Sequence, residues 1–459
     1  MPVAKDARLF YKQLFVLVGP IALQNLISAA VNSADVLMLN YVGQTALAAS
    51  SLAGQVSFVL MLFYVGLASG LVMLTAQYWG RGDSYSIETL AGIALKISGA
   101  VGLVFAGASF FCPELLMRIF TNEPKLIQTG AEYLKIVSLS FLLMSVSQVY
   151  EAVFKSIEKV RIVTAITFIT LTLNIILNAV FIFGLFGAPK LGIRGVALAT
   201  TISRVVEILI CIGVSFAVRE VKLRPSVLFR KNTVLMRDFV HYSFPAMGNE
   251  VVWGLAFSIY SAILGRLGED IVASNSVVAV VRELASVLCF GMAYGGAILL
   301  GKEMGGSNLE HARADASRLW RSVTVAGFLA SLVILALRPL VLSMVTLTPT
   351  ATHYLSLMLI ISAVNIFGAA INTGFICGLF RAGGDAKFGL IMDSIAMWGV
   401  SIPLGLLAAF VLKLPPVWVY LILSLDEFEK IPFVIWHYRK DTWVKNITRD
   451  FDSEEKALE

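Results

Sequence analysis

The chain contains long segments that are apolar on every helical face, and this feature limits it to one broad class of fold. A helix crosses the hydrocarbon of a bilayer with about 20 predominantly apolar residues. Runs of at least this length recur along the 459 residues, of which 58% are hydrophobic and only 14% charged. Soluble domains carry about 25% charged residues and show a polar face on most surface helices. The sequence therefore predicts an all-α integral membrane protein.

Twelve runs are long enough to span a membrane. The predicted spans are 14–39, 47–77, 90–112, 132–154, 162–186, 195–217, 240–264, 272–301, 321–345, 353–380, 388–412 and 416–437. The longest polar connection, 218–239, separates an amino-terminal bundle of six helices (1–217) from a carboxy-terminal bundle of six with a short tail (240–459). We expect 218–239 to be a cytoplasmic linker.

The positive charges indicate how the chain is oriented. Roughly two thirds of the 36 Lys and Arg residues fall in the two termini and in the even-numbered loops, and cytoplasmic loops are the ones enriched in these residues. We therefore expect a multi-pass protein of the cytoplasmic membrane with both termini in the cytoplasm. The net charge of +6 has the same origin, so no nucleic-acid partner is predicted.

The two halves match one another in a single register. When the second half is slid onto the first so that Pro20 meets Pro245, Gln24 meets Asn249. With one further residue of shift, "FKSIEKVR" (154–161) meets "FRAGGDAK" (380–387). Six spans is an even number, so both copies insert with the same orientation. The pattern predicts a parallel duplication, an arrangement known among transporters.

Matched prolines and glycines indicate how the helices bend and pack. Pro20 and Pro245 each lie inside a span, where proline removes a backbone hydrogen bond and permits a kink. A matched pair of kinks is compatible with moving elements and with inert bends. The same register aligns pairs of glycines in "GLASG" and "GMAYG", namely Gly66 with Gly291 and Gly70 with Gly295. For these we favour close packing of helices.

One acid interrupts the first span. In "VGPIALQNLISAAVNSADVLMLNYVG" (18–43) this acid is Asp35, and a carboxylate in hydrocarbon costs at least about 2.5 kcal/mol. Neighbouring Asn32 is also polar, so this face is predicted to line a cavity. We interpret Asp35 as a carboxylate that binds a proton or a cation. The alternative is an acid near a helix end that reaches water.

A second acid, Glu250, lies deeper in the seventh span. No Lys or Arg lies within two turns of it on the same helix. Unless another span supplies a partner, it must be protonated, hydrated or bound to a cation. Trp253 is one turn away, and an aromatic ring beside an acid suits a flat organic cation.

Two amides share a helix face in the fifth span. Asn174 and Asn178 are four residues apart in "LTLNIILNAVFIFG", a spacing that puts both on one side of a helix. Their oxygens suit coordination of Na⁺ or a hydrogen bond to an acid, while asparagine also joins helices without further function. The sequence has no phosphate-binding loop, metal-ligand cluster or nucleophile–base arrangement, so we expect no enzyme and no cofactor. An ion gradient would supply the energy.

These features together resemble the multidrug and toxic compound extrusion family, MATE. The resemblance rests on the 18–43 segment, on "LNIILNAVFIFG…LGIRGVALATTISR" (173–204), and on "LPPVWVYLILSLDEFEKIP" with "WVKNITR", which look like members from Gram-positive bacteria. It implies two pseudo-symmetric six-helix bundles around a central V-shaped cavity that rocks between inward-open and outward-open states. It also implies export of organic cations in exchange for inward H⁺ or Na⁺.

The resemblance also assigns candidate site residues. The coupling set is Asp35, Glu250, Asn174, Asn178 and one of Thr200 or Thr201, with Na⁺ possible at Asp35, Asn174 and Asn178. The predicted substrate-cavity residues are Gln24, Asn32, Asn249, Trp253 and Asn372, and the predicted kinks are Pro20 and Pro245. We expect a monomer in the bilayer whose partners are cationic small molecules.

Two departures from the family bear on the coupling ion. Position 178 is Asn where many relatives carry Asp, and the tenth span offers only Asn365 and Asn372 where some Na⁺-coupled members carry Asp. Both losses favour H⁺. A flippase for a lipid-linked precursor is the alternative function on the same fold, but an anionic cargo would need a basic cavity. A membrane transferase would need clustered acids or an interfacial His, which the sequence lacks.

Overall fold

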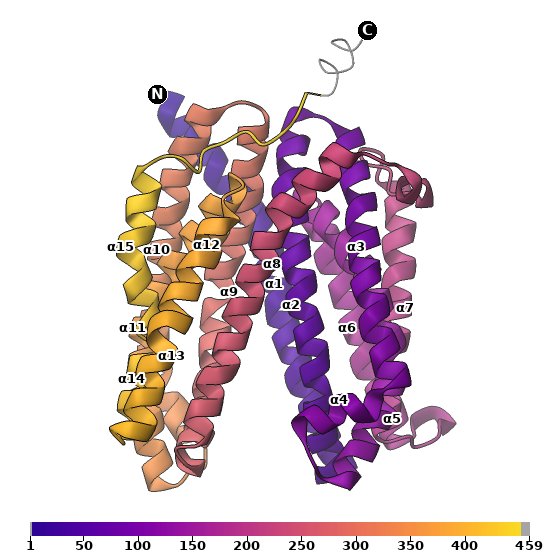
Figure 1. Ribbon diagram of the computed structural model, residues 1–459, viewed down its shortest axis with the longest axis vertical. Helices are drawn as coiled ribbons and strands as arrows, with labels where there is room; N and C mark the ends of the chain where they lie inside the picture. Colours follow the sequence, from indigo (N-terminus) through magenta and orange to yellow (C-terminus); the bar gives the residue numbers. More distant parts are fainter. Residues whose placement is uncertain (1, 451–459) are drawn as a thin grey trace. The chain divides into compact units, whose positions relative to one another are not determined.

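The computed structural model describes residues 2–450, although the side chains of 2–6, 32, 33, 36, 37, 40 and 225 lie outside that description. The first half contains α1 (Pro2–Val42), α2 (Gln44–Arg81), α3 (Ser84–Phe111), α4 (Pro113–Phe120), α5 (Pro124–Ser156), α6 (Val160–Phe183), η1 (Leu185–Gly187), α7 (Ile193–Ala217) and η2 (Pro225–Phe229) (Figure 1). The second half contains α8 (Thr233–Gly265), α9 (Glu269–Gly305), α10 (Leu309–Met344), α11 (Pro349–Thr373), η3 (Gly374–Phe380), α12 (Ala386–Asp393), η4 (Ser394–Ser401), α13 (Ile402–Leu406), η5 (Leu407–Val411), α14 (Pro416–Leu423) and α15 (Asp426–Arg439).

Contacts between residues group the helices into two compact units that are not contiguous in sequence. Unit 1 contains Met1–Ala22, Met73–Asp83 and Gly248–Glu459, and unit 2 contains Leu23–Val72 and Ser84–Met247. The chain therefore changes unit inside α1, α2 and α8. The predicted halves 1–217 and 240–459 describe the duplication, and as domain boundaries they stay a prediction.

The predicted spans correspond closely to helices. Among the described residues, eleven helices are long and apolar enough to cross a membrane. The predicted twelfth span, 416–437, is built differently, from the short α14 followed by α15. The chain turns at Ser424 and Leu425, and three acids open the first turn of α15. The pattern of apolar runs did not indicate α4, an amphipathic helix in the loop after α3.

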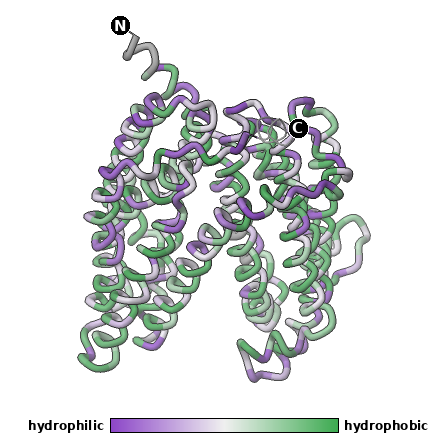
Figure 2. The backbone as a smooth tube through the Cα atoms, turned by 45° about the horizontal axis from the view of Figure 1, so that its top comes forward, coloured by the Kyte–Doolittle hydropathy of each residue, from purple (hydrophilic) through white to green (hydrophobic). Residues whose placement is uncertain are grey.

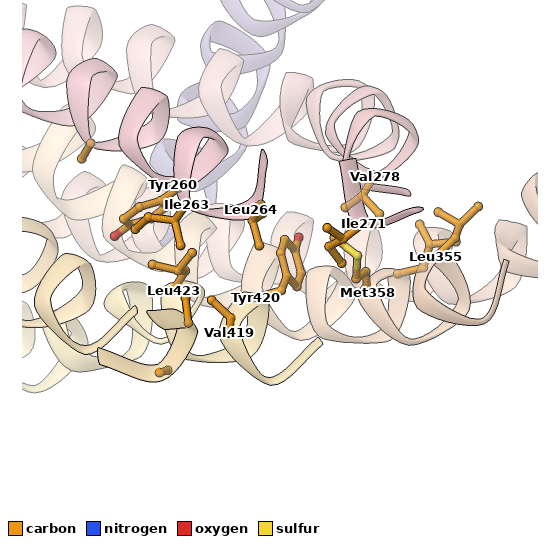
Figure 3. Packing of buried hydrophobic residues seen from close by; sticks show 14 of the residues in the cluster. Tyr260, Ile263, Leu264, Ile271, Val278, Leu355, Met358, Val419, Tyr420 and Leu423 are labelled. Atoms are coloured by element: carbon orange, nitrogen blue, oxygen red, sulfur yellow. The ribbon is translucent and has the colours of Figure 1, made fainter. Parts of the chain in front are cut away.

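Each unit has its own apolar core. In unit 2, α2 and α5 bury Leu60 and Phe141 against one another, and Tyr64 donates a hydrogen bond to the Phe141 carbonyl at 2.9 Å. In unit 1, side chains of α8, α9, α11 and α14 meet, as Figure 3 shows around Tyr260 and Leu423. The packed pairs α3 with α5 and α10 with α11 occupy equivalent places in the two copies.

Apolar side chains also cover the outside of the helices. Hydrophobic residues run along the helices of each unit, and hydrophilic ones gather in the connecting segments (Figure 2). In α10, about half of the surface of Phe328, Leu329 and Leu332 is exposed. Monomeric soluble domains rarely expose an apolar surface of this extent, whereas such a surface is favourable in contact with lipid tails. The structure is that of an integral membrane protein, as predicted.

The glycines aligned by the duplication pack against equivalent helices. In unit 2, Gly66 and Gly70 of α2 lie against α8, with no room for a Cβ. In unit 1, Gly291 and Gly295 of α9 lie against the first part of α1, at ordinary van der Waals distance. The predicted role of these glycines in helix packing is confirmed, and the α2–α8 contact is the tighter of the two.

Gly70→Ala is expected to destabilise the protein, because the new Cβ would overlap the Cα and Cβ of Ser243 and only a shift of α2 or α8 relieves it. Overpacking of this kind costs about 1–3 kcal/mol. Thermal unfolding of the purified protein measures the change. Gly54→Ala, on the same helix with nothing within 4 Å of its Cβ, is the matched control and should melt like wild type. Equal melting of both variants would contradict the close packing.

Candidate functional site

A polar cluster lies inside unit 2, where α1, α6 and α7 meet. The Nδ2 of Asn178 donates to the Oδ1 of Asp35 at 2.7 Å and to the Oδ1 of Asn174 at 3.2 Å. The Nδ2 of Asn174 lies 3.5 Å from the Oγ1 of Thr200. The structure thus brings together four residues that the resemblance had placed in one site.

The two asparagines meet Asp35 because of their spacing on α6. Side chains four residues apart lie one above the other on a helix, and both are buried, with Asn178 fully inaccessible. The backbone carbonyls of α6 are used by the helix, so the amides turn to each other and to α1. Because the two amides lie one turn apart, they form a chain of hydrogen bonds that ends on the Asp35 carboxylate.

The cluster can accept a proton or a small cation. Asp35 is partly buried and makes no ion pair with any Lys or Arg that the structure describes. The Oδ1 of Asn178 is buried and has no hydrogen-bond partner in the described part of the chain. A buried acceptor without a donor is unfavourable. A proton on the carboxyl of Asp35, or a cation beside it, would neutralise the carboxylate and could also interact with the Asn178 oxygen.

The other amino-terminal candidates lie elsewhere. The Thr201 hydroxyl donates to the carbonyls of Ala197 and Ile136, at 2.9 and 3.2 Å, so of the two threonines it is Thr200 that joins the cluster. The side chain of Asn32 lies outside the described residues. Gln24 donates to the Oγ1 of Thr167 at 2.9 Å and belongs to a separate polar group.

Glu250 is not the lone carboxyl that the sequence suggested. Its Oε1 lies 2.8 Å from the Nη1 of Arg381, and the exposed fractions of the two side chains are 12% and 4%. No base on the same helix is close enough, and the partner comes from the segment between η3 and α12. The structure therefore favours the alternative that another span supplies a counter-charge.

The ion pair continues into a buried network within unit 1. The Nη2 of Arg381 donates to the Oδ1 of Asn249 at 2.7 Å. The Nδ2 of Asn249 donates to Asp393 at 2.5 Å, and Asp393 also accepts from Lys430 at 3.0 Å. Charged groups in hydrocarbon need such partners. This network fixes α8 to α12 and α15.

Two predicted substrate-cavity residues are committed to the network. Asn249 and Asn372 are each only 3% exposed. Asn372 donates to the backbone carbonyl and the Oε2 of Glu427, at 2.6 and 2.7 Å. In this structure neither amide is on an open surface, which corrects their placement on a cavity wall. Trp253 is half-buried and packs edge-on against Phe257 at 4.6 Å.

Sequence reasoning gave Arg381 no role and expected Asp393 to be solvated near a helix end, whereas Asp393 is buried. The repeat carried a signal for both residues. The register that aligns "FKSIEKVR" with "FRAGGDAK" places Lys155 on Arg381, and Lys155 likewise pairs with an acid, Glu151, at 3.6 Å. The bond from Gln24 to Thr167 in unit 2 has its counterpart in the bond from Asn249 to Asp393. Aligned bases at the end of each fourth span therefore predict equivalent polar groups in both copies.

Comparisons with known proteins agree with this architecture. The family model described as MatE matches residues 20–180 and 245–407, two segments that begin at the aligned prolines. The chain is 24% identical to the uncharacterized transporter YisQ of Bacillus subtilis, over 94% of this chain and 95% of that protein. It is 27% identical to the probable multidrug resistance protein NorM of Rhizobium meliloti, over 84% of this chain and 83% of that one.

Two solved structures have a similar fold. The Vibrio cholerae MATE transporter VcmN in the bent form superposes with a TM-score of 0.84 at 18% identity, over 96% of this chain and all of that one. A transporter of the MOP superfamily from Pyrococcus furiosus gives 0.83 at 18% identity, over 94% of this chain and 96% of that one. For the Pyrococcus protein, reverse polarity of the binding pocket suggests a different function. At these identities the likeness concerns the fold.

Proposed function

The chain belongs to the MatE family of membrane transporters, and from this premise we propose that it is a secondary active antiporter that exports organic cations. It is a transporter and not an enzyme. The exported substrate would exchange for inward H⁺ or Na⁺ by rocking between two access states. The multidrug resistance names of several relatives support this class of substrate.

The observation that carries the proposal is the environment of Asp35. A partly buried carboxylate accepts a hydrogen bond from Asn178 and has no ion-pair partner among the described residues. This environment indicates that Asp35 takes up and releases a proton or cation and is not part of a structural ion pair. Intramembrane acids without counter-charges commonly mark ion or proton pathways. Neutralising the carboxylate lowers the cost of enclosing it, so the loaded site can close.

One-for-one exchange of an ion for a singly charged cation moves no net charge, so the concentration gradient of the ion supplies the energy, about 1.4 kcal/mol for each tenfold difference. This energy is sufficient to drive a modest outward gradient of substrate. Competition between the coupling ion and an organic cation for the same negative charge would link the two movements. The antiporter needs no other energy source.

We favour H⁺ as the coupling ion. A hard cation such as Na⁺ prefers several oxygen ligands, and Asn178 uses its Nδ2 as a donor toward Asp35. Asn at position 178 also provides one negative charge fewer than the Asp of many relatives. A single proton on Asp35 neutralises the carboxylate without any further ligand.

Ethidium efflux measured in inverted membrane vesicles tests the function and the ion together. Gradients of pH and of Na⁺ are imposed separately, with vesicles lacking the transporter as the control. We expect ethidium accumulation that a pH gradient, acidic inside, drives and that Na⁺ leaves unchanged. Accumulation driven by Na⁺ alone would reject H⁺ coupling, and no accumulation under either gradient would reject export of this organic cation.

We propose that both ends of the chain lie on the cytoplasmic side of the membrane. The start of α1 and the end of α15 belong to unit 1 and lie at the same end of it (Figure 1). Together with the distribution of Lys and Arg, this supports cytoplasmic placement of both termini in the cell membrane. The proposed unit of function is a monomer, with neither nucleic acid nor a cofactor.

A further inference from the structure

Unit 1 contains a second group of acids that the proposed coupling site does not use. The Nζ of Lys430 lies 3.0 Å from Asp393, 3.3 Å from Glu427 and 3.6 Å from Asp426. The Lys430 side chain is 2% exposed, and none of the three carboxyl side chains exceeds 10%. One ammonium group therefore faces three buried carboxyl groups.

The charges of this group do not balance. The neighbouring pair of Glu250 and Arg381 is neutral by itself, so it offers no spare positive charge. With every group ionised, the three acids around Lys430 would leave an excess of negative charge inside the helices. Burial of an uncompensated charge costs several kcal/mol, and a buried group commonly takes a proton instead. Three carboxylates against one ammonium leave two negative charges in excess, so the arrangement calls for a proton on at least one of the three carboxyls.

The hydrogen bonds identify which carboxyl is least stabilised as an anion. Asp393 accepts from Lys430 and from Asn249. Glu427 accepts from Asn372 at 2.7 Å and also faces Lys430. Asp426 accepts a backbone hydrogen bond from Glu427 and makes the longest of the three ion pairs with Lys430, while its Oδ2 is buried with no hydrogen-bond partner in the described part of the chain. Hydrogen bonds to the ionised form favour it, so the proton belongs on Asp426.

Two hydroxyl groups lie in the polar surroundings of Asp426. Tyr260 of α8 interacts electrostatically with Asp426 and Lys430, and Ser401 lies beside the Tyr260 hydroxyl. The hydroxyls of Tyr260 and Ser401 are both buried and lie next to each other. Ser401 ends η4, a π-helical segment, and such segments occur frequently at functional sites.

The duplication shows why this site is hard to see in the sequence. The register that places Pro20 on Pro245 also places Asp35 on Tyr260. The carboxy-terminal copy therefore has a phenol where the amino-terminal copy has its acid. In unit 1 the carboxyl comes instead from the first residue of α15.

We propose that Asp426 is a second proton-binding carboxyl, located in unit 1 and separate from Asp35. A proton from bulk water adds to the carboxylate of Asp426, and the resulting acid leaves Lys430 to Asp393 and Glu427. The site binds a proton whether or not the transported substrate is a drug. It accordingly adds to the proposed function without depending on it.

Infrared difference spectroscopy tests the site directly, on the full chain purified in lipid nanodiscs. Wild type minus Asp426→Asn should show the C=O band of one protonated carboxyl at neutral pH, with the expected shift in D₂O. Glu429→Gln, which removes a more exposed acid on the same helix, and Asp35→Asn should both keep the band. If Asp426→Asn retains every protonated-carboxyl band of wild type, Asp426 is ionised and the proposal is wrong. A band that Na⁺ abolishes would assign the site to a metal cation and overturn the proton.

Thermal unfolding supplies a second, independent measurement. An Asn side chain resembles a protonated Asp, so Asp426→Asn should melt close to wild type. Asp393→Asn removes an ionised partner of Lys430 and should melt markedly lower. Equal loss in the two variants would show that Asp426 is an ordinary ion-pair partner. Neither measurement uses transport, so a failure here is distinguishable from a failure of the antiport proposal.

Discussion

Asp35→Asn is expected to reduce ethidium efflux to the level of cells that lack the transporter. The substitution keeps the size of the side chain and removes the only charged group in the cluster of α1, α6 and α7. Without a carboxylate, the site can neither bind a proton nor attract a cation, and the coupling between ion and substrate is lost. Drug susceptibility of cells and efflux from inverted vesicles both measure this loss.

The abundance and melting temperature of Asp35→Asn should stay near those of wild type, because no buried counter-charge is left behind. Glu114→Gln, an exposed acid of α4 in the same unit, is the control for loss of one negative charge and should transport normally. Full resistance in Asp35→Asn would remove Asp35 from the mechanism. Loss of protein from the membrane would instead show that the carboxylate has a structural role.

Local periodicity predicted this site better than it predicted the network in unit 1. Asn174 and Asn178 share a face because of a spacing that is visible in the sequence, and the structure joins them to Asp35. The partner of Glu250 is Arg381, which lies well beyond that helix in the chain. A helix-by-helix inspection sees only neighbours on the same helix, so it cannot find a pair that tertiary packing creates. Only the alignment of the two copies pointed to a base at that position.

The positions of the membrane-spanning helices were also predictable from local sequence, with one exception at 416–437. Apolar runs of about 20 residues give helices with well-defined centres, and their ends extend further because polar flanks continue the helix. The run 416–437 satisfies the count of apolar residues, yet it contains Asp426, Glu427 and Lys430. These charges begin a new helix, α15, whose first turn faces the buried network.

The matched prolines coincide with the organisation into units. Pro20 of α1 and Pro245 of α8 lie just before Ala22 and Met247, the points where the two helices leave one unit and enter the other. A proline interrupts the hydrogen-bond ladder of a helix, so each helix is weakest where its two parts belong to different units. We interpret both prolines as the positions where the helices bend during the proposed rocking cycle.

Arg381→Met is expected to destabilise unit 1 strongly. It leaves Glu250 buried without a counter-charge and takes a donor from Asn249. Loss of one partner from a buried pair costs about 3–5 kcal/mol. Glu250→Gln should cost less, because Arg381 keeps its bond to Asn249 and an amide oxygen can still accept from the guanidinium. Thermal unfolding and the amount of protein in the membrane measure both effects.

The double variant Glu250→Gln with Arg381→Met separates structure from coupling. When both charges are absent, no buried charge lacks a partner, so the double variant should be more stable than Arg381→Met alone. Additive losses would mean that the two side chains act independently, contrary to the 2.8 Å contact. If Glu250→Gln instead melts like wild type but fails to transport, Glu250 is a coupling carboxyl and Arg381 releases it during the cycle. The ion pair would then belong to one access state, and its formation and rupture would be part of the rocking movement.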